Sequence, residues 1–330
     1  MAELLDVRGV KTYLHTSMGV VKAVDGVSFD VKQGETVALV GESGCGKTMT
    51  ALSIMRLLPR PQAEIVGGEI CFEGRNLLDL DDEEMRRVRG AEIAMIFQEP
   101  MTSLNPVLTI ERQLTETLEA HGAASKQETR ARALELLRLV GISDPVERLK
   151  QYPHQFSGGM RQRVMIAIAL SCRPKLILAD EPTTALDVTI QAQLLELMRG
   201  LSRQFGVALV MITHNLGVVA RYADRVNVMY AGKIIESGPA ADIYRDPRHP
   251  YTIGLLRSVP RLDQPRKARL DPIDGQPPDL WDLPMGCSFR PRCKFAVEKC
   301  AREVPPLRRV EGAHEAACWV ETAESLVPRH

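Results

Sequence analysis

The sequence has no excess of charge of either sign, because 42 lysines and arginines are matched by 42 aspartates and glutamates. A formal net charge of zero argues against a general binder of polyanions such as nucleic acid. No apolar run approaches the ~20 residues that a membrane-spanning helix needs, and residues 1–6 lack the charged-then-apolar layout of a secretory signal. Internal repeats and low-complexity tracts are absent as well. We therefore expect a cytosolic protein, which can still dock on a membrane protein.

Cysteine is scarce, and its placement along the chain is uneven. Seven cysteines in a cytosolic chain of 330 residues are not expected to form a disulfide framework. Four of the seven fall in the last 44 residues, and this clustering needs its own explanation. Hydrophobic residues make up 45% of the chain and charged residues 25%, which predicts a packed core in one large domain or two smaller ones.

One glycine-rich stretch lies between a predicted buried strand, residues 36–40, and a predicted helix, residues 49–58. It fits the phosphate-binding pattern G-x-x-x-x-G-K-[ST], in which backbone N–H groups and a helix N-terminus cradle phosphate oxygens. A chance glycine-rich turn is the alternative, but such a turn would not explain why a predicted strand precedes the stretch and a predicted helix follows it. Lys47 is expected to reach the β- and γ-phosphates, and Thr48 to ligate Mg²⁺. The nucleotide-binding residues predicted here are Gly41, Ser43, Gly44, Cys45, Gly46, Lys47, Thr48 and Met49.

The pattern along the rest of the chain predicts an α/β protein. Residues 4–32 and 65–72 show the short alternations of an antiparallel β-layer. Further elements are predicted as strands at 93–97, 176–179 and 208–212 and as helices at 83–88, 110–120, 126–140, 164–170 and 189–205. Strands that alternate with helices imply a parallel sheet with helices on both faces. Prolines become frequent after residue 246, so we place the end of the core fold near residue 245.

Two acidic residues follow the predicted strand at 176–179. Asp180 is placed to hold Mg²⁺, directly or through water, as in a Walker B strand. Glu181 is placed to polarise an attacking water as a general base. The alternative is an Asp-Glu pair at an ordinary strand-to-loop turn, which the upstream phosphate-binding pattern makes less favourable.

A second glycine-containing stretch, Ser157 to Arg163 (SGGMRQR), resembles the signature motif of ABC-type ATPases, which is usually written LSGGQ. Phe156 and Met160 stand where that motif has its Leu and Gln. Both replacements are tolerated in the subfamily that the chain resembles, so they cast little doubt on activity.

Other positions match the same family in one continuous order over residues 1–245. Gln98 falls at the Q-loop glutamine, Asp187 at the D-loop aspartate and His214 at the switch histidine. Tyr13 falls at the aromatic residue that stacks on adenine. Taken alone, His214 is more simply explained as a capping or core histidine, but its place after a predicted core strand favours the switch position.

The resemblance extends to one subfamily of ABC ATPases. Residues 95–106, 152–160, 185–193 and 248–252 look like the corresponding segments of the ATP-binding subunits of bacterial dipeptide and oligopeptide importers. This implies an α/β fold of the P-loop NTPase, ABC type, with a RecA-like core, an antiparallel β-layer and a helical subdomain at about residues 99–155. The nucleotide-binding domain would span residues 1–245. A small Cys-rich C-terminal lobe, residues 246–330, would follow it.

The family mechanism implies that one cassette cannot complete its own site, because two ATP molecules are held in a head-to-tail dimer. The residues implied to act on one ATP are Lys47, Thr48, Gln98, Asp180, Glu181 and His214. Of these, Glu181, His214 and Gln98 would be catalytic, and Thr48, Gln98 and Asp180 would surround Mg²⁺. Ser157, Gly158 and Gly159 would act on the ATP held by the partner, with Asp187 beside them.

The same resemblance implies a set of partners. These are a second homologous ATPase, two transmembrane permease subunits and a periplasmic peptide-binding protein, with no nucleic acid. The protein would lie on the cytoplasmic face of the bacterial inner membrane. A soluble ABC ATPase of DNA repair, chromosome handling or translation is the competing class, and a catalytically inactive regulatory subunit is a third. The cargo is not encoded in this chain.

The cysteines near the C-terminus follow the spacing C-x5-C-x6-C-x17-C, formed by Cys287, Cys293, Cys300 and Cys318. Four thiolates suit either tetrahedral Zn²⁺ or a [4Fe–4S] cluster, and free buried cysteines are the remaining alternative. Zinc sites prefer closely spaced pairs, which are missing here, and the resemblance implies an iron–sulfur cluster. The nucleotide-binding core is expected to bind ATP without this segment. Cys45 is either a reactive thiolate at a helix N-terminus or an inert small residue that fits the turn.

Overall fold

The structure is a computed structural model that describes residues 3–122, 125–183, 186–258 and 273–321. The chain divides into two compact units. The first, which we call the P-loop unit, comprises Glu3–Val31, Val37–Leu78 and Ile212–His330. The second, the signature unit, comprises Met1–Ala2, Lys32–Thr36 and Asp79–Met211. Of the prolines that follow residue 246, those at 260, 265 and 272 lie outside the described part, as do the last nine residues.

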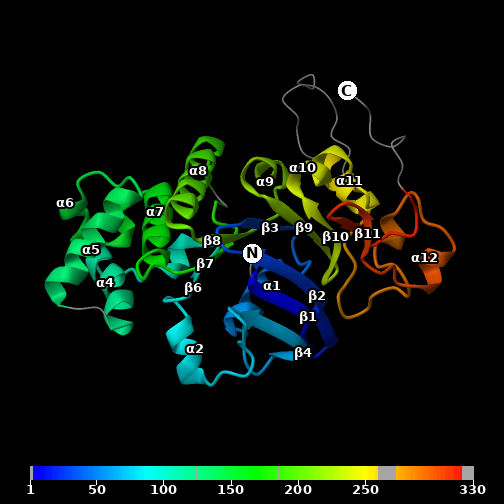
Figure 1. Cartoon of the computed structure of the whole chain (residues 1–330), viewed down its shortest axis with the longest axis horizontal. Helices are drawn as coiled ribbons and strands as arrows, with labels where there is room; N and C mark the ends of the chain where they lie inside the picture. Colours follow the sequence, from blue (N-terminus) through cyan, green and yellow to red (C-terminus); the bar gives the residue numbers. More distant parts are fainter. Residues whose placement is uncertain (1–2, 123–124, 184–185, 259–272, 322–330) are drawn as a thin grey trace. The chain divides into compact units, whose positions relative to one another are not determined.

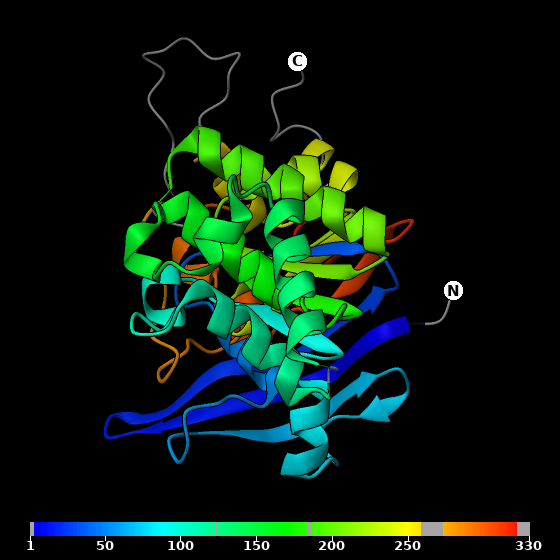
Figure 2. The ribbon, with the colours of Figure 1, turned by 90° about the vertical axis from the view of Figure 1, so that its left-hand side faces the viewer.

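The P-loop unit contains the predicted antiparallel β-layer. Its strands are β1 (Glu3–Thr16), β2 (Gly19–Lys32), β4 (Ala63–Phe72) and β5 (Arg75–Asn76), in the order β2-β1-β4-β5. Figure 2 shows β1 and β2 as long dark-blue strands, with β4 in lighter blue beside them. Alternate residues of β1 are buried, and Leu5 lies opposite Phe72 and Val7 opposite Ile70. These apolar cross-strand pairs fix the register of the layer.

A second sheet of the P-loop unit contains the strand that precedes the glycine-rich loop. β3 (Thr36–Val40) is buried along its whole length and pairs in parallel with β9 (Arg225–Tyr230). β10 (Lys233–Pro239) pairs antiparallel with β9. β12 (His314–Ala316) then pairs with β10, and β11 (Arg308–Glu311) with β12. The parallel β3–β9 pair agrees with the predicted sheet, whereas the antiparallel extension was not predicted.

This extension corrects one expectation about the C-terminal residues. A separate Cys-rich lobe is not supported, because β12 hydrogen-bonds to β10 and residues 273–321 belong to the same compact unit as the P-loop. A buried hydrogen bond holds the junction: Glu236, fully buried on β10, accepts a hydrogen bond from the ring of His314 on β12 (Oε1–Nε2 2.8 Å). The same carboxylate accepts the backbone N–H of His249 at 3.0 Å.

The helices of the P-loop unit are α1 (Lys47–Met55), α9 (Leu216–Tyr222), α10 (Ala240–Arg245), α11 (Pro250–Arg257) and α12 (Lys299–Arg302), with a 3₁₀ turn at Arg290–Arg292. Side chains of α9, α10 and α11 pack with β3 and β9 and with Phe289 in one buried cluster. α1 ends earlier than predicted, because Arg56 takes a left-handed conformation (φ 52°) and caps the helix.

The signature unit holds the strands β6 (Ile93–Ile96) and β7 (Leu176–Asp180), which pair in parallel, and β8 (Ala208–Thr213), which follows β7 in the sheet order. Residues 212–213 of β8 fall in the other unit. Its helices, labelled in Figure 1 except for α3, are α2 (Asp82–Val88), α3 (Pro100–Ser103), α4 (Ile110–Ala120), α5 (Lys126–Leu139), α6 (Pro145–Leu149), α7 (Gly158–Ala169) and α8 (Val188–Phe205), with a 3₁₀ turn at Pro153–Gln155. The predicted strands and long helices of this unit are therefore confirmed to within a few residues, except the start of α7.

Candidate functional site

The glycine-rich loop connects β3 to α1 as the sequence predicts, and two of its glycines are required by close backbone contacts. A Cβ on Gly41 would lie 2.3 Å from the carbonyl oxygen of Met229, and a Cβ on Gly46 would lie 2.1 Å from that of Ala23. Gly46 also has a φ of 107°, which side-chain-bearing residues rarely adopt. The loop therefore packs so tightly on β9 and β2 that only glycine fits at these positions.

The lysine of the loop is turned back over it. The Nζ atom of Lys47 donates to the carbonyl oxygens of Gly41 at 2.8 Å and Glu42 at 2.9 Å. Lys47 is buried, with 5% of its surface exposed, so its ammonium group is held inside the curve of the loop. A cation in that position is suited to the charge of phosphate oxygens.

The other predicted residues of the loop differ in exposure. Ser43, Gly44 and Thr48 are exposed at the loop surface and at the start of α1, where a ligand can reach them. Met49 is half-buried in α1. The structure thus brings all eight predicted residues together in one loop and one helix N-terminus. Their contacts with nucleotide stay a prediction.

Cys45 does not have the environment of a reactive thiolate. It is buried, with 6% of its surface exposed, and burial raises the pKa of its thiol above the ordinary value. Lys47, whose Nζ lies 3.8 Å from Sγ, lowers this pKa but does not outweigh burial. The explanation of Cys45 as a small residue that fits the turn is therefore favoured over the reactive one.

Glu42 was missed by the sequence reasoning, although it lies inside the loop. Its backbone N–H donates to the hydroxyl of Tyr251 on α11 at 2.8 Å. Its carboxylate binds both terminal nitrogens of Arg292, at 2.7 Å and 2.9 Å. Tyr251 and Arg292 follow Glu42 by 209 and 250 residues, and no local pattern marks such distant partners.

The predicted adenine-stacking residue lies on β1 of the P-loop unit. Tyr13 is half-buried, and its hydroxyl donates to Asp25 Oδ1 at 3.0 Å. Burial raises the pKa of Asp25, but the nearby Lys233 and the Tyr13 hydroxyl outweigh it, so the pKa of Asp25 lies below its ordinary value. His214, the predicted switch residue, is exposed just after the end of β8.

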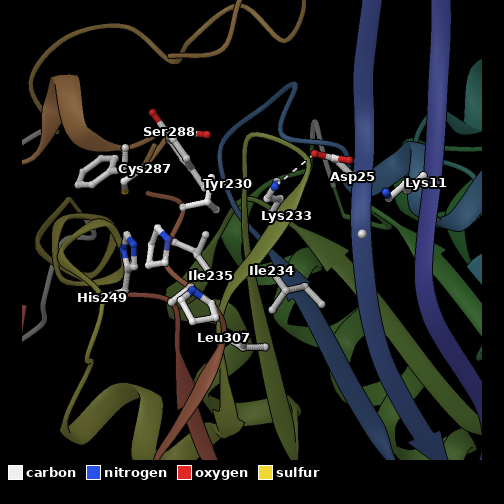
Figure 3. A pocket seen from close by; sticks show the side chains of 16 residues that line it. Lys11, Asp25, Tyr230, Lys233, Ile234, Ile235, His249, Cys287, Ser288 and Leu307 are labelled. Carbon is white, nitrogen blue, oxygen red and sulfur yellow. Dashed lines mark ion pairs between the residues drawn. The ribbon is translucent and has the colours of Figure 1, made fainter. Parts of the chain in front are cut away.

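A cavity of about 430 Å³ lies next to Asp25 in the P-loop unit, between β1, β10 and the C-terminal residues. Figure 3 shows the Lys233–Asp25 ion pair (3.2 Å) on one side of it and Tyr230, His249 and Cys287 on the other. Its lining is mostly apolar. None of the predicted nucleotide-binding residues lines this cavity, so it is separate from the loop surface.

The signature unit carries the predicted acidic pair at the end of β7. Asp180 is buried as the last residue of the strand, and Glu181 follows it with a left-handed backbone conformation (φ 43°). Such a conformation is strained for a residue with a side chain. The Nε2 atom of Gln98, just beyond β6, donates to Glu181 Oε2 at 3.1 Å. The structure therefore brings together the predicted general base and the predicted Q-loop glutamine.

The signature motif forms the beginning of α7, which starts at Gly158 and not at residue 164 as predicted. The reason is a cap: the Ser157 hydroxyl oxygen accepts the backbone N–H of Met160 at 3.4 Å. A hydroxyl that accepts a cap still has a hydrogen to donate. Ser157 and Gly158 are exposed, so they remain accessible to a ligand from outside this unit.

Asp187 caps the neighbouring helix in the same way. Its Oδ1 atom accepts the backbone N–H of Ile190 at 3.0 Å at the start of α8. A Cβ on Gly159 would lie 3.0 Å from the side chain of Ile190, so the starts of α7 and α8 pack closely. The residues 184–185 just before this cap lie outside the described part, although the resemblance included Ala185.

The four C-terminal cysteines line one small cavity of the P-loop unit. Burial raises the pKa of the Cys287 and Cys293 thiols, and that of Cys318 to about 11. No three His, Cys, Asp or Glu side chains among the described residues are close enough to hold one metal ion. The expected four-cysteine metal site is therefore not established by this structure, and the described residues form no tetrahedral zinc site.

These features define a P-loop nucleotide-binding protein with an ABC-type signature helix, and comparison with known proteins agrees. Residues 24–184 match the family model described as ABC transporter. Residues 235–300 match the model described as oligopeptide/dipeptide transporter, C-terminal region.

Relatives span nearly the whole chain. The dipeptide transport ATP-binding protein DppD of Bacillus subtilis (strain 168) is 54% identical over 321 residues, 97% of this chain and 96% of that protein. A probable peptide ABC transporter ATP-binding protein of Sinorhizobium fredii is 54% identical over 316 residues, 96% of this chain and 94% of that protein. The oligopeptide transport ATP-binding protein OppD of Bacillus subtilis is 50% identical, over 97% of this chain and 89% of that protein. The chain therefore belongs to the family of ATP-binding subunits of peptide ABC transporters.

Solved structures support the cassette fold. The dimeric, post-hydrolysis structure of the ATP-binding cassette MJ0796, bound to ADP and Pi, has a TM-score of 0.64 and 30% identity. The superposition covers 72% of this chain and 98% of that cassette. The structure adds one observation on membranes: within the described ranges, no helix is both long and apolar enough to span a bilayer.

Proposed function

We propose that this chain is the ATP-binding and ATP-hydrolysing subunit of a bacterial ABC importer that takes up dipeptides or oligopeptides. The observation that carries the proposal is the occurrence in one chain of an ABC cassette and of the C-terminal region of oligopeptide/dipeptide transporters. Two relatives named for dipeptide and oligopeptide transport, at 54% and 50% identity, support it. None of these features favours a soluble ATPase of DNA repair or translation.

The proposed roles on ATP follow the chemistry of each side chain. Tyr13 stacks on adenine, and the backbone N–H groups of the loop receive the phosphate oxygens. Lys47 moves its ammonium group from the two loop carbonyls to the β- and γ-phosphates. Thr48, Asp180 and Gln98 would hold Mg²⁺, and the bound ion would neutralise phosphate charge.

In hydrolysis, Glu181 accepts a proton from the attacking water. A bond forms between the water oxygen and the γ-phosphorus, and the bond from that phosphorus to the β–γ bridging oxygen breaks, leaving ADP and phosphate. His214 donates a hydrogen bond to the γ-phosphate, and Gln98 holds Glu181 in place through the contact at 3.1 Å.

We propose that the signature residues act on a second cassette. Ser157, Gly158 and Gly159 present a hydroxyl and backbone N–H groups to the ATP of the partner, and Asp187 lies next to them at the same helix starts. The partner ATPase is homologous but different, so the pair is a heterodimer. The nucleotide-binding domain is residues 1–245 with a helical subdomain at about 99–155, and residues 246–330 form the peptide-importer extension.

The complete importer contains two transmembrane permeases and a periplasmic peptide-binding protein besides the two ATPases. The protein is then peripheral, at the cytoplasmic face of the inner membrane. The helical subdomain carries the docking groove for a permease. Cargo selection rests with the binding protein and the permeases.

We also propose that Cys287, Cys293, Cys300 and Cys318 hold a [4Fe–4S] cluster with a structural role, with zinc as the alternative. The support is that four thiols line a single cavity and that four cysteines are the usual ligand set of such a cluster. Protein purified without oxygen should be brown and contain about four iron and four sulfide per chain. One zinc per chain in colourless protein would assign the site to zinc, and absence of both metals would leave buried thiols.

A deletion strain tests the proposed function. Cells that lack the gene should lose uptake of a labelled dipeptide or tripeptide, and the wild-type gene should restore it. A Lys47→Ala variant should not restore uptake, because the phosphates lose their cation, whereas Lys32→Ala, at an exposed lysine that ends β2, should. Normal peptide uptake in the deletion strain, together with an active ATPase that stays out of the membrane fraction, would favour the soluble class.

A further inference from the structure

The second residue of the P-loop is held through all of its polar groups. The carbonyl oxygen of Glu42 accepts from Lys47 Nζ at 2.9 Å, and its N–H donates to the Tyr251 hydroxyl at 2.8 Å. Its carboxylate forms a two-pronged ion pair with Arg292 at 2.7 Å and 2.9 Å. Two of these three anchors come from residues that follow the ABC family match at 24–184. The loop conformation therefore depends on the C-terminal part of the chain.

Arg292 is fixed in turn by its own surroundings. Only 4% of its side chain is exposed. Its Nε donates to the carbonyl oxygen of Asp274 at 3.1 Å, and its guanidinium group lies 5.9 Å from the ring centres of Tyr230 and Phe289. Arginine keeps its proton in proteins, so the guanidinium group of Arg292 brings a positive charge to the two hydrogen bonds with Glu42. A rigid, planar guanidinium that binds a carboxylate with both nitrogens sets position as well as charge.

The C-terminal residues approach the loop at a second point. A cavity of about 300 Å³ has Glu42, Ser43, Gly44 and Cys45 on one side and residues 277–281 on the other. The carbonyl oxygen of Leu280 also accepts the N–H of Lys22 on β2 at 3.3 Å. Residues 273–293, which we call the P-loop brace, thus contact the phosphate-binding loop and the strand next to it.

The ion pair also changes the net charge of the phosphate-binding loop. Glu42 follows Gly41 in the loop, and the carbonyl oxygens of both residues hold the Lys47 ammonium group that is expected to bind phosphate oxygens. An uncompensated carboxylate there would repel a triphosphate. Arg292 cancels that charge and, since it is buried, is only weakly screened by salt.

We propose that Arg292 is a positioning residue for ATP: through Glu42 it holds the P-loop in its phosphate-binding shape and neutralises a carboxylate beside the phosphates. The proposal rests on the proposed function only in taking ATP as the ligand of the loop. It differs from the expectation that the core binds ATP without the C-terminal segment. Because Cys293 follows Arg292 directly, the brace also connects the cavity of four cysteines to the P-loop.

The test compares four variants of the full chain by titration with a fluorescent ATP analogue. Arg292→Ala should weaken binding by roughly tenfold, the loss expected when one charge-assisted contact of a pair is removed. Glu42→Gln should weaken it less, because it removes the repelling charge together with the ion pair. The double variant should bind more tightly than Arg292→Ala alone. Arg245→Ala, at an exposed arginine of α10 in the same unit, is the control and should bind like the wild type.

Binding stoichiometry separates positioning from mere folding. If Arg292 only stabilises the fold, the variant should show fewer binding sites with an unchanged dissociation constant. In the assembled transporter, Arg292→Ala should raise the KM for ATP and leave kcat near the wild-type value. Where Arg292→Ala does not fold, Arg292→Lys decides, because it keeps the charge and loses the two-pronged geometry, and an intermediate affinity is expected.

Three outcomes would contradict the inference in whole or in part, and one would not concern it. Wild-type affinity in Arg292→Ala would show that the ion pair does not act on the nucleotide. Equal losses in Arg292→Ala and the double variant would show that the Glu42 carboxylate does not repel the phosphates. Wild-type affinity in Arg292→Lys would remove the geometric part of the argument. Failure of the wild-type chain to bind ATP at all would contradict the proposed function and not the role of Arg292.

Discussion

Replacing Glu181 with glutamine isolates the proposed chemistry from the fold. The side chains have the same shape, and glutamine keeps an oxygen that accepts the Gln98 hydrogen bond, now 3.1 Å long. The left-handed backbone at this position, φ 43°, imposes a similar strain on both residues. What changes is the charge and the ability to accept a proton.

The expected size of the effect follows from that single change. A positioned general base contributes about 10²–10⁴ in rate, which corresponds to roughly 2.7–5.4 kcal/mol of transition-state stabilisation. ATP binding should stay within about twofold of the wild type, since the P-loop of the other unit is untouched. The closed ATP-bound dimer should therefore accumulate, because closure requires the γ-phosphate but not its cleavage.

The assay is ATP turnover in the assembled transporter, together with single-turnover measurements of phosphate release and a filter assay for retained ATP. Glu83→Gln, at an exposed glutamate of α2 in the same unit, is the matched control and should hydrolyse ATP normally. Turnover by Glu181→Gln close to the wild-type rate would show that Glu181 is not the base. Loss of ATP binding along with turnover would mean that the substitution disturbs the site and not only the chemistry.

Three further predictions concern the P-loop unit. Gly46→Ala should abolish ATP binding in the same titration, because the added Cβ would lie 2.1 Å from a backbone oxygen. The control Gly200→Ala should bind normally, because its added Cβ would have no atom within 4 Å, and tight binding by Gly46→Ala would refute the packing argument. Cys45 should react slowly with a maleimide at pH 7 and faster as pH rises, because its raised pKa keeps the thiol protonated at neutral pH, and bound ATP should slow the reaction; mass spectrometry measures the rates, and modification as fast as that of a free thiol at pH 7 would contradict the buried environment. His314→Ala should lower the free energy of unfolding by about 2–3 kcal/mol, since it leaves the buried Glu236 without one charge-assisted partner; an unchanged melting temperature would show that the pair does not hold the C-terminal strands.

Much of the nucleotide site could be predicted from the sequence, because its signals are local. A phosphate-binding loop needs its glycines, lysine and threonine within eight consecutive residues, and the structure connects β3 to α1 through that loop. The strand before Asp180 and the helix after Asp187 are marked by apolar runs and a capping residue, and both formed where expected. Motif order along the chain was sufficient to place the protein in its family.

The tertiary structure alone decided how the C-terminal residues are used. β12 pairs with β10 across about 80 residues of chain, and Arg292 meets Glu42 across 250. Such contacts depend on which surfaces the fold brings together, and neither partner has a local pattern that marks it. The protonation state of Cys45 was also decided by the tertiary structure. The sequence places Cys45 at a helix N-terminus, which favours a thiolate. Packing then buries the side chain, and this burial raises the pKa of the thiol above its ordinary value.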